Sequence, residues 1–382
     1  MPTTDTARER VQRVLDRVVA QERVPGIVAE VQDGDGAWFG SAGLADLNTG
    51  RERGPGEYLH FGSNGKAFTA ATVLRLVAEG RLSLDDTVEE WLPGVANANG
   101  NDGAALVIRQ LLNHTSGLFA TGLSPRTAYR YFTRSAVEEH RHDVLTTEFL
   151  LELAVSEPPA HAPGERFLYA NGGYYLLGAI IEQVTGNSYA DEVGRAVIEP
   201  LGLTRTHVRS AAEATYPDPH PRAYSNKFLR EGVRPEDVTP ENWHLMMEDP
   251  SLPPLDLTEM NSSLGWSAGN VVSTTSEMIR FYRAMSTGAL LPPDLHEEAW
   301  ATVSTEGANW VPGVRYGLGV WERTLANGVV LRGGGGSNPG SDSMVMCTPD
   351  GGRAIAIQTN NDGNVPIFFE ILEAAFGSPA SG

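Results

Sequence analysis

The sequence predicts an α+β fold in which one antiparallel sheet, built from both ends of the chain, is flanked by an N-terminal and a C-terminal helix. Strand-like runs lie near both termini, and helical periodicity prevails between them. Strands from the two ends can share a sheet only if the middle of the chain forms an insertion. We expect a discontinuous sheet domain over 1–62 and 265–382, a mainly helical domain over 63–264, and an active site at their junction.

The first expected elements are a helix and a hairpin. Apolar residues recur at helical spacing from Val11 to Val19, and the helix should end before Pro25. Strand-like runs follow at 27–32 and 38–42, with the turn signal Asp-Gly-Asp-Gly between them. The hairpin would provide the N-terminal strands of the sheet.

The middle of the chain is typical of helices joined by long loops. A helical pattern over 67–80 closes on Gly80, which suits a left-handed cap at the end of a helix. The loops are rich in Pro, His and Asn and are most irregular near 217–221 and 250–254. Further helical stretches are expected at 107–112, 146–155 and 173–185.

Beyond residue 310 the sequence changes to short strand-like runs with Gly-containing turns between them. An apolar helix over 365–376 follows and would be the C-terminal flanking helix. The expected strands span 317–321, 329–331, 344–347 and 354–358.

Composition excludes several classes of protein. The chain has 382 residues, of which 48 are acidic and 29 basic, for a net charge of −19. An acidic chain without a basic stripe is not expected to bind nucleic acid. Its 41% hydrophobic and 20% charged residues are typical of a globular protein with a large core. Cys347 is the only cysteine, which excludes an internal disulfide and a Cys-only metal site.

The sequence contains no recognisable targeting or membrane segment. Residues 1–24 lack the unbroken apolar region of a secretory signal. The best apolar stretch, Tyr174 to Ile181, is far shorter than the roughly 18 residues of a spanning helix. We therefore expect a cytoplasmic protein without a membrane partner.

The most informative stretch is Phe-Gly-Ser-Asn-Gly-Lys at 61–66, in which Ser63 lies three residues before Lys66 at the start of a helix. Residues at this spacing share a helix face. A buried lysine with a lowered pKa can take the proton of a serine hydroxyl, and a helix N-terminus offers N–H groups to an oxyanion. The alternative is a helix-capping serine with an unrelated lysine one turn later.

Two further segments strengthen the first interpretation. Tyr169 and Asn171 present a phenol and an amide two residues apart, just before the helix expected at 173–185. Four glycines at 333–336 follow a strand-like run and precede Ser337. A glycine strand lets a substrate approach the backbone closely because no Cβ blocks it.

In this order and with these intervals, the sequence resembles the serine β-lactamase and penicillin-recognising family, nearest the class C β-lactamases, the DD-peptidases and the esterases of that fold. The resemblance covers about residues 10–375. It extends to Leu-Leu-Asn-His-Thr-Ser-Gly-Leu at 111–118 and to Ser-Ala-Gly-Asn-Val-Val-Ser-Thr at 267–274. It implies a β-lactamase-like fold.

The resemblance also implies roles for individual residues. Ser63 would be the acylated nucleophile and Lys66 its base, and Tyr169 would carry the proton to the leaving group. Asn171 would hydrogen-bond either Lys66 or the substrate amide. The backbone N–H groups of Ser63 and Ser337 would form the oxyanion hole.

The glycine strand departs from the family pattern. Most penicillin-recognising enzymes have Lys-Thr-Gly or His-Thr-Gly there, whose cation and hydroxyl bind a substrate carboxylate. The corresponding triplet here is 334–336, or a triplet shifted by one residue within the glycine run. In either register the cation and the hydroxyl are missing, so Gly335 and Gly336 would line the substrate with backbone alone, unless Arg332 reaches in. A carboxylate without its partner would lose a hydrogen bond worth roughly 1.5 to 3 kcal/mol.

Three other signals are weaker. Gly-Trp-Ser-Ala-Gly at 265–269 matches a nucleophile elbow around Ser267, but no apolar strand precedes it. The acidic and histidine cluster at 138–143 fits no standard zinc spacing. His114 lies in an apolar helical context and is expected to be a hydrogen-bonded buried histidine.

These observations predict a serine enzyme that forms an acyl-enzyme on a small ester or amide, without cofactor or metal. With water as acceptor it is an esterase or amidase; with an amine or alcohol it is an acyl transferase of a biosynthetic pathway. The alternatives are a true β-lactamase or DD-peptidase, and a binding or scaffold protein of the same fold. The sequence does not predict an oligomeric state.

Overall fold

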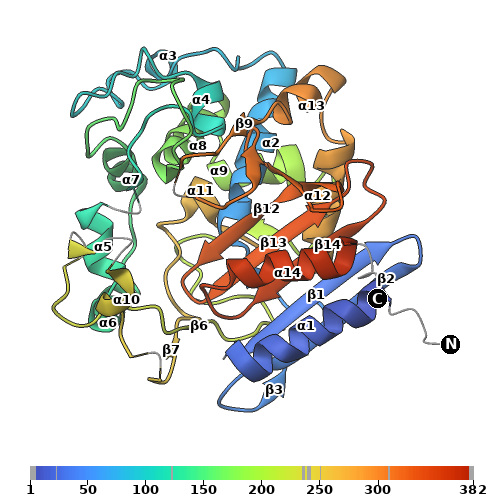
Figure 1. The fold of residues 1–382 in the computed structure, drawn as a ribbon. Coiled ribbons are helices and arrows are strands. Elements are labelled where there is room, and N and C mark those ends of the chain that lie inside the picture. The colour runs from blue at the N-terminus through green and yellow to red at the C-terminus, as the bar shows by residue number, and fades with distance from the viewer. Residues whose placement is uncertain are drawn as a thin grey trace.

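A computed structural model describes residues 6–22, 24–121, 124–234, 237–238, 242–249, 251–308 and 310–377. Its centre is a nine-stranded sheet in the order β3-β2-β1-β14-β13-β12-β11-β10-β9, and all neighbouring strands are antiparallel (Figure 1). Strands from the two ends of the chain therefore meet where β1 pairs with β14. The strands are β1 (Gly26–Asp33), β2 (Gly36–Asp46), β3 (Arg51–Glu52), β9 (Val303–Ser304), β10 (Val314–Tyr316), β11 (Trp321–Thr324), β12 (Val330–Asn338), β13 (Ser341–Cys347) and β14 (Ala354–Thr359).

Helices cover both faces of this sheet. The N-terminal helix α1 (Ala7–Glu22) and the C-terminal helix α14 (Val365–Phe376) lie side by side on one face, and α12 (Thr275–Thr287) packs on the other (Figure 1). The central strands alternate accordingly. On β14, Ile355 and Ile357 join the core under α1 and α14, whereas Ala354 and Ala356 join the core on the α12 side. The expected α+β, β-lactamase-like fold is confirmed.

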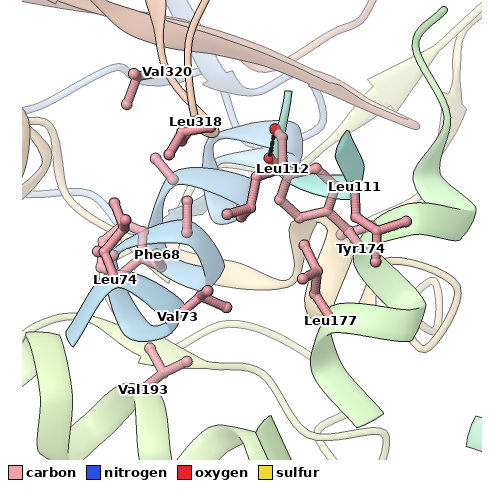
Figure 2. Close-up of a cluster of buried hydrophobic side chains, with 14 of the residues drawn as sticks. Phe68, Val73, Leu74, Leu111, Leu112, Tyr174, Leu177, Val193, Leu318 and Val320 are labelled. Carbon is pink, nitrogen blue, oxygen red and sulfur yellow. Dashed lines mark hydrogen bonds between the residues drawn. The ribbon is translucent and has the colours of Figure 1, made fainter. Parts of the chain in front are cut away.

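The helices of the middle region surround α2 (Gly65–Ala78) and α8 (Asn171–Thr185). Phe68 and Val73 of α2 belong to one buried apolar cluster with Leu177 of α8 (Figure 2). Tyr174 lies in this core, and its hydroxyl donates to the Leu112 carbonyl at 2.7 Å. The other helices are α3 (Val88–Trp91), α4 (Ile108–Leu112), α5 (Pro125–Tyr131), α6 (Arg134–His140), α7 (Thr147–Ala154), α9 (Tyr189–Val193), the π-helix η3 (Gly194–Ile198), α10 (Trp243–Met246), α11 (Trp266–Gly269) and α13 (Pro293–Ala299).

Two small sheets complete the described structure. One contains β4 (Leu59–His60), β8 (Val271–Ser273) and β5 (His207–Val208), and the other pairs β6 (Tyr224–Ser225) with β7 (Leu255–Asp256). The first sheet continues toward residue 63, because the Phe61 N–H donates to the Val271 carbonyl at 2.9 Å.

Two strand predictions are wrong in extent. Of the run 317–321, only Trp321 lies in a strand, because the chain turns between β10 and β11. Gly319 has φ +75°, and the Gly317 N–H donates to the Val320 carbonyl at 2.8 Å. The strand expected at 329–331 is β12, which continues through the glycine run to Asn338.

The division into two domains at residues 62/63 and 264/265 stays a prediction. One hydrophobic cluster contains side chains of both parts, among them Phe68 of α2 and Val345 of β13.

None of the described helices combines the length and the apolar character needed to cross a membrane.

Candidate active site

Ser63 lies in a tight turn between the small sheet and a buried helix. The 3₁₀ turn η1 spans Gly62–Asn64, and α2 begins at Gly65. The N-cap of α2 is Asn64 and it makes no side-chain capping bond, so the alternative of a helix-capping serine is wrong. Ser63 is half-buried, and its hydroxyl is available to other partners.

Lys66 reaches back to Ser63 along the first turn of α2. Its Nζ donates to Ser63 Oγ at 3.2 Å and to the Ala268 carbonyl at 2.5 Å. The side chain is 1% exposed, and no carboxylate among the described residues lies within ion-pair distance of it. Burial therefore lowers the pKa of the Lys66 ammonium well below its usual value. A neutral amine at this position can accept the Ser63 proton.

Tyr169 completes the group of polar side chains at Ser63. Its ring is tilted against His114 at 4.3 Å and stacks on Trp310 at 5.5 Å, and Lys66 Nζ lies 4.9 Å from its centre. Burial raises the pKa of the Tyr169 phenol, and a hydrogen bond with Ser63 offsets this only in part. The phenol is thus protonated near neutral pH, which suits a proton relay better than a base.

The glycine strand lies directly against the Ser63 turn. A Cβ added to Gly336 would lie 2.0 Å from the Phe61 carbonyl oxygen and 2.6 Å from Ser63 N. A Cβ on Gly62 would lie 2.8 Å from the Ser337 carbonyl oxygen and 3.0 Å from Ser337 N. Real Cβ atoms do not come this close, so these positions require glycine. The contacts bring the backbone nitrogens of Ser63 and Ser337, the two predicted oxyanion donors, to the same corner of the site.

The rest of the glycine triplet leaves no room for the side chains of the Lys-Thr-Gly pattern. A Cβ on Gly334 would lie 2.0 Å from the Tyr282 hydroxyl, which donates to Asn64 Oδ1 at 2.7 Å. A Cβ on Gly335 would lie 2.5 Å from the Trp321 ring. A substrate carboxylate would find no cation at positions 334–336.

Arg332 does not reach into the site. Its Nε donates to Glu322 Oε2 at 3.3 Å, and its guanidinium lies 4.6 Å from the Trp300 ring centre.

A cleft of about 270 Å³ opens beside Ser63. Among the described residues, no charged side chain lines it, and its walls are aromatic, aliphatic or neutral polar. Asn171 borders the cleft, and its buried Oδ1 has no hydrogen-bond partner in the described structure. The hydrogen bonds of Lys66 go elsewhere, so a substrate N–H is the remaining predicted partner of Asn171. The side-chain wall of the cleft comprises Thr127, Tyr131, Phe132, Tyr216, Leu257, Met260 and Leu264.

Sequence reasoning did not find this side-chain wall. Its residues come from α5 and the position after it, from the loop at Tyr216 and from the loop 257–264, and no local motif marks these separate segments. The Ala268 carbonyl was also missed as a partner of Lys66, although the segment 267–274 carries part of the family resemblance.

The competing signals lie elsewhere. Ser267 is 0% exposed and its hydroxyl donates to the Tyr174 carbonyl at 2.9 Å, so it does not face the cleft as an elbow nucleophile would. In the cluster at 138–143, the Asp143 carboxylate pairs with Arg130 and with His140. Among the described residues, no three His, Cys, Asp or Glu side chains are placed to hold a metal.

Comparison with known proteins decides the family. The family model described as Beta-lactamase matches residues 11–376. The chain belongs to the Beta-lactamase family. The resemblance seen in the sequence is thereby confirmed.

Relatives within the family include proteins named as an amidohydrolase, a penicillin-binding protein and an esterase. A D-stereospecific amidohydrolase from Streptomyces sp. is 36% identical, with a TM-score of 0.83 over 96% of this chain and 98% of the other. Penicillin-binding protein 4* of Bacillus subtilis (strain 168) is 26% identical over 97% of this chain and 77% of its own. Esterase EstB of Burkholderia gladioli is 34% identical over 51% of this chain and half of its own. The fold is therefore that of the family's serine hydrolases.

Proposed function

We propose that this member of the Beta-lactamase family is a serine hydrolase that cleaves small, uncharged esters or amides through an acyl-enzyme on Ser63. The observation that carries the proposal is a buried lysine, without a carboxylate partner among the described residues, whose Nζ lies 3.2 Å from a serine hydroxyl beside an uncharged cleft. The names of an amidohydrolase and an esterase among its relatives support the substrate class.

The first step transfers a proton and forms a bond. Neutral Lys66 takes the Ser63 proton, and Ser63 Oγ attacks the substrate carbonyl carbon. The resulting oxyanion lies against the backbone N–H groups of Ser63 and Ser337. One such donor typically stabilises a transition state by about 2.7 to 4 kcal/mol.

The second step breaks the ester or amide bond. Tyr169 gives its proton to the departing alcohol or amine and recovers one from the Lys66 ammonium. Asn171 Oδ1 accepts a hydrogen bond from a substrate N–H, which only an amide or an acylamino substrate offers. Water then attacks the acyl-enzyme and releases the acid; an amine or alcohol in its place would make the protein a transferase.

The uncharged cleft and the glycine strand argue against β-lactam or D-Ala-D-Ala substrates, whose carboxylate would find no cation. Apolar contacts with the Tyr131, Phe132 and Met260 wall would hold the substrate instead.

Labelling tests the proposal. The protein is treated with a fluorophosphonate, and the modified peptide is identified by mass spectrometry. We expect the adduct on Ser63, and we expect Ser63→Ala to abolish hydrolysis of p-nitrophenyl butyrate, while Ser267→Ala, the matched change at the elbow-like serine, remains labelled. An adduct on Ser267, or full activity of Ser63→Ala, would refute the proposal. An amide product formed when an amine is added would assign the transferase reaction.

A further inference from the structure

Two buried histidines flank the site and have no part in the proton transfers described above. His60 ends strand β4, and His114 follows α4 with φ +59°. Each is 1% exposed. A buried imidazole is costly unless its nitrogens are hydrogen-bonded, so the partners of each ring show which parts of the chain it holds.

His60 binds the turn that carries Ser63. The Gly62 N–H donates to His60 Nδ1 at 3.0 Å, so in a neutral ring the proton is on Nε2. That nitrogen lies 2.9 Å from Asn270 Oδ1, and the Asn270 amide is oriented by its own bond to the Arg209 carbonyl at 2.6 Å. Burial lowers the pKa of His60 to about 4, so the ring is neutral near pH 7.

His114 binds the loop that carries Tyr169 in the same manner. The Ala170 N–H donates to His114 Nδ1 at 3.2 Å, and Nε2 lies 3.2 Å from the Tyr316 hydroxyl. The ring also packs on the Tyr169 ring. Burial lowers the pKa of the His114 imidazole well below its usual value.

The two arrangements are equivalent. In each, Nδ1 accepts the backbone N–H of a residue directly adjacent to a reacting residue, Gly62 before Ser63 and Ala170 after Tyr169. In each, Nε2 is tied to a buried partner. Resting on the proposed function, we propose that His60 and His114 are positioning residues, His60 for the nucleophile and its oxyanion donor, and His114 for the proton relay.

This assignment predicts different effects on different leaving groups. An ethoxide must be protonated as it leaves, whereas p-nitrophenolate needs little help. Loss of the His114 bond should therefore slow an ethyl ester more than the p-nitrophenyl ester of the same acid. Loss of the His60 bond should slow both equally, since both need attack by Ser63. A merely structural defect would not produce this pattern, in which the ratio of the ethyl to the p-nitrophenyl rate changes in the His114 variant but stays constant in the His60 variant.

The test measures kcat/KM for ethyl and p-nitrophenyl butyrate with variants at both positions. An Asn side chain places its oxygen near the position of Nδ1 and tolerates a left-handed backbone, so His60→Asn and His114→Asn retain the acceptor. His60→Gln and His114→Gly remove it, the latter without strain at φ +59°. Thermal unfolding verifies that each variant is folded.

We expect His114→Gly to lower kcat/KM for the ethyl ester about 10-fold more than for the p-nitrophenyl ester, and His60→Gln to lower both about 10- to 100-fold. The Asn variants should recover most of each loss. Wild-type rates in folded His60→Gln and His114→Gly, or Asn variants no better than these, would overturn the assignment. If a Gln or Gly variant does not fold, the Asn variant at the same position decides. A near-wild-type rate with an unaltered leaving-group ratio supports the assignment. A loss as large as that of Tyr169→Phe, which lacks the relay hydroxyl, overturns it. Ser63→Ala is assayed in parallel, because activity that survives that change refutes the proposed function itself and not only the role of the histidines.

Discussion

The two walls of the cleft are built in different ways. The wall that carries Ser63 is held by backbone contacts: a Cβ on Gly65 would lie 2.9 Å from Gly269 Cα, and one on Gly336 would lie 2.6 Å from Ser63 N. The side-chain wall is formed by residues such as Tyr131, Leu257 and Met260 from a seven-residue helix and loops.

Under the proposed function, this difference separates the residues that carry out the chemistry from those that select the substrate. Where main chain touches main chain, almost any substitution displaces the reacting atoms. Where side chains meet the substrate, a substitution changes the shape of the space and leaves the reacting atoms in place. Three substitutions test this contrast, one at the base, one in the backbone contact and one in the side-chain wall.

The largest effect is expected at the base. Lys66→Met keeps the length of the buried side chain but removes the amine, so kcat/KM for p-nitrophenyl butyrate should fall about 10²- to 10⁴-fold, the usual contribution of general base catalysis. The sequence has only two lysines, and Lys227→Met at the exposed second one is the matched control, with an unchanged rate expected. Comparable rates for Lys66→Met and the control would mean that another group takes the Ser63 proton.

The backbone contact is expected to come next. Gly336→Ala places a methyl group against the Phe61 carbonyl and Ser63 N and should move one oxyanion donor out of place. We expect about a 10²- to 10³-fold loss of kcat and an unfolding free energy lower by about 1 to 3 kcal/mol, measured by urea denaturation. Gly34→Ala is the control, since its Cβ would meet nothing within 4 Å. Full activity of Gly336→Ala would show that strand β12 can move away from the Ser63 turn without loss of function.

The smallest effect is expected in the side-chain wall. Met260→Ala removes apolar contact from the cleft but leaves Ser63 and Lys66 untouched. The kcat/KM for a hexanoyl ester should fall about 10-fold, mainly through KM, because one methylene contact in an apolar pocket is worth ~1–3 kcal/mol. Leu252→Ala, exposed and outside the cleft, should behave like the unaltered protein. A loss in kcat as large as that of Lys66→Met would abolish the distinction between the walls.

What the sequence could predict follows the same division. The approach of Lys66 to Ser63 depends on one helical turn, and a local spacing was enough to expect it. The sheet built from both ends of the chain was likewise predicted, because strand-like runs occur near both termini. The cleft wall was not, because Tyr131 and Met260 become neighbours only through the tertiary fold.

Glycine explains the errors in the strands. Periodicity depends on side chains, so a run of four glycines gave no strand signal although β12 passes through it. At 317–321, apolar residues suggested a strand, but the left-handed Gly319 made a turn.

The pairing of β1 with β14 has a consequence for the order in which the proposed site is assembled. Ser63 and Lys66 leave the ribosome before Ser337 and the strands that fix it are synthesised. Under the proposed mechanism, a nascent chain carries Ser63 without the Ser337 N–H and gains this second oxyanion donor only when β12, β13 and β14 have joined β1.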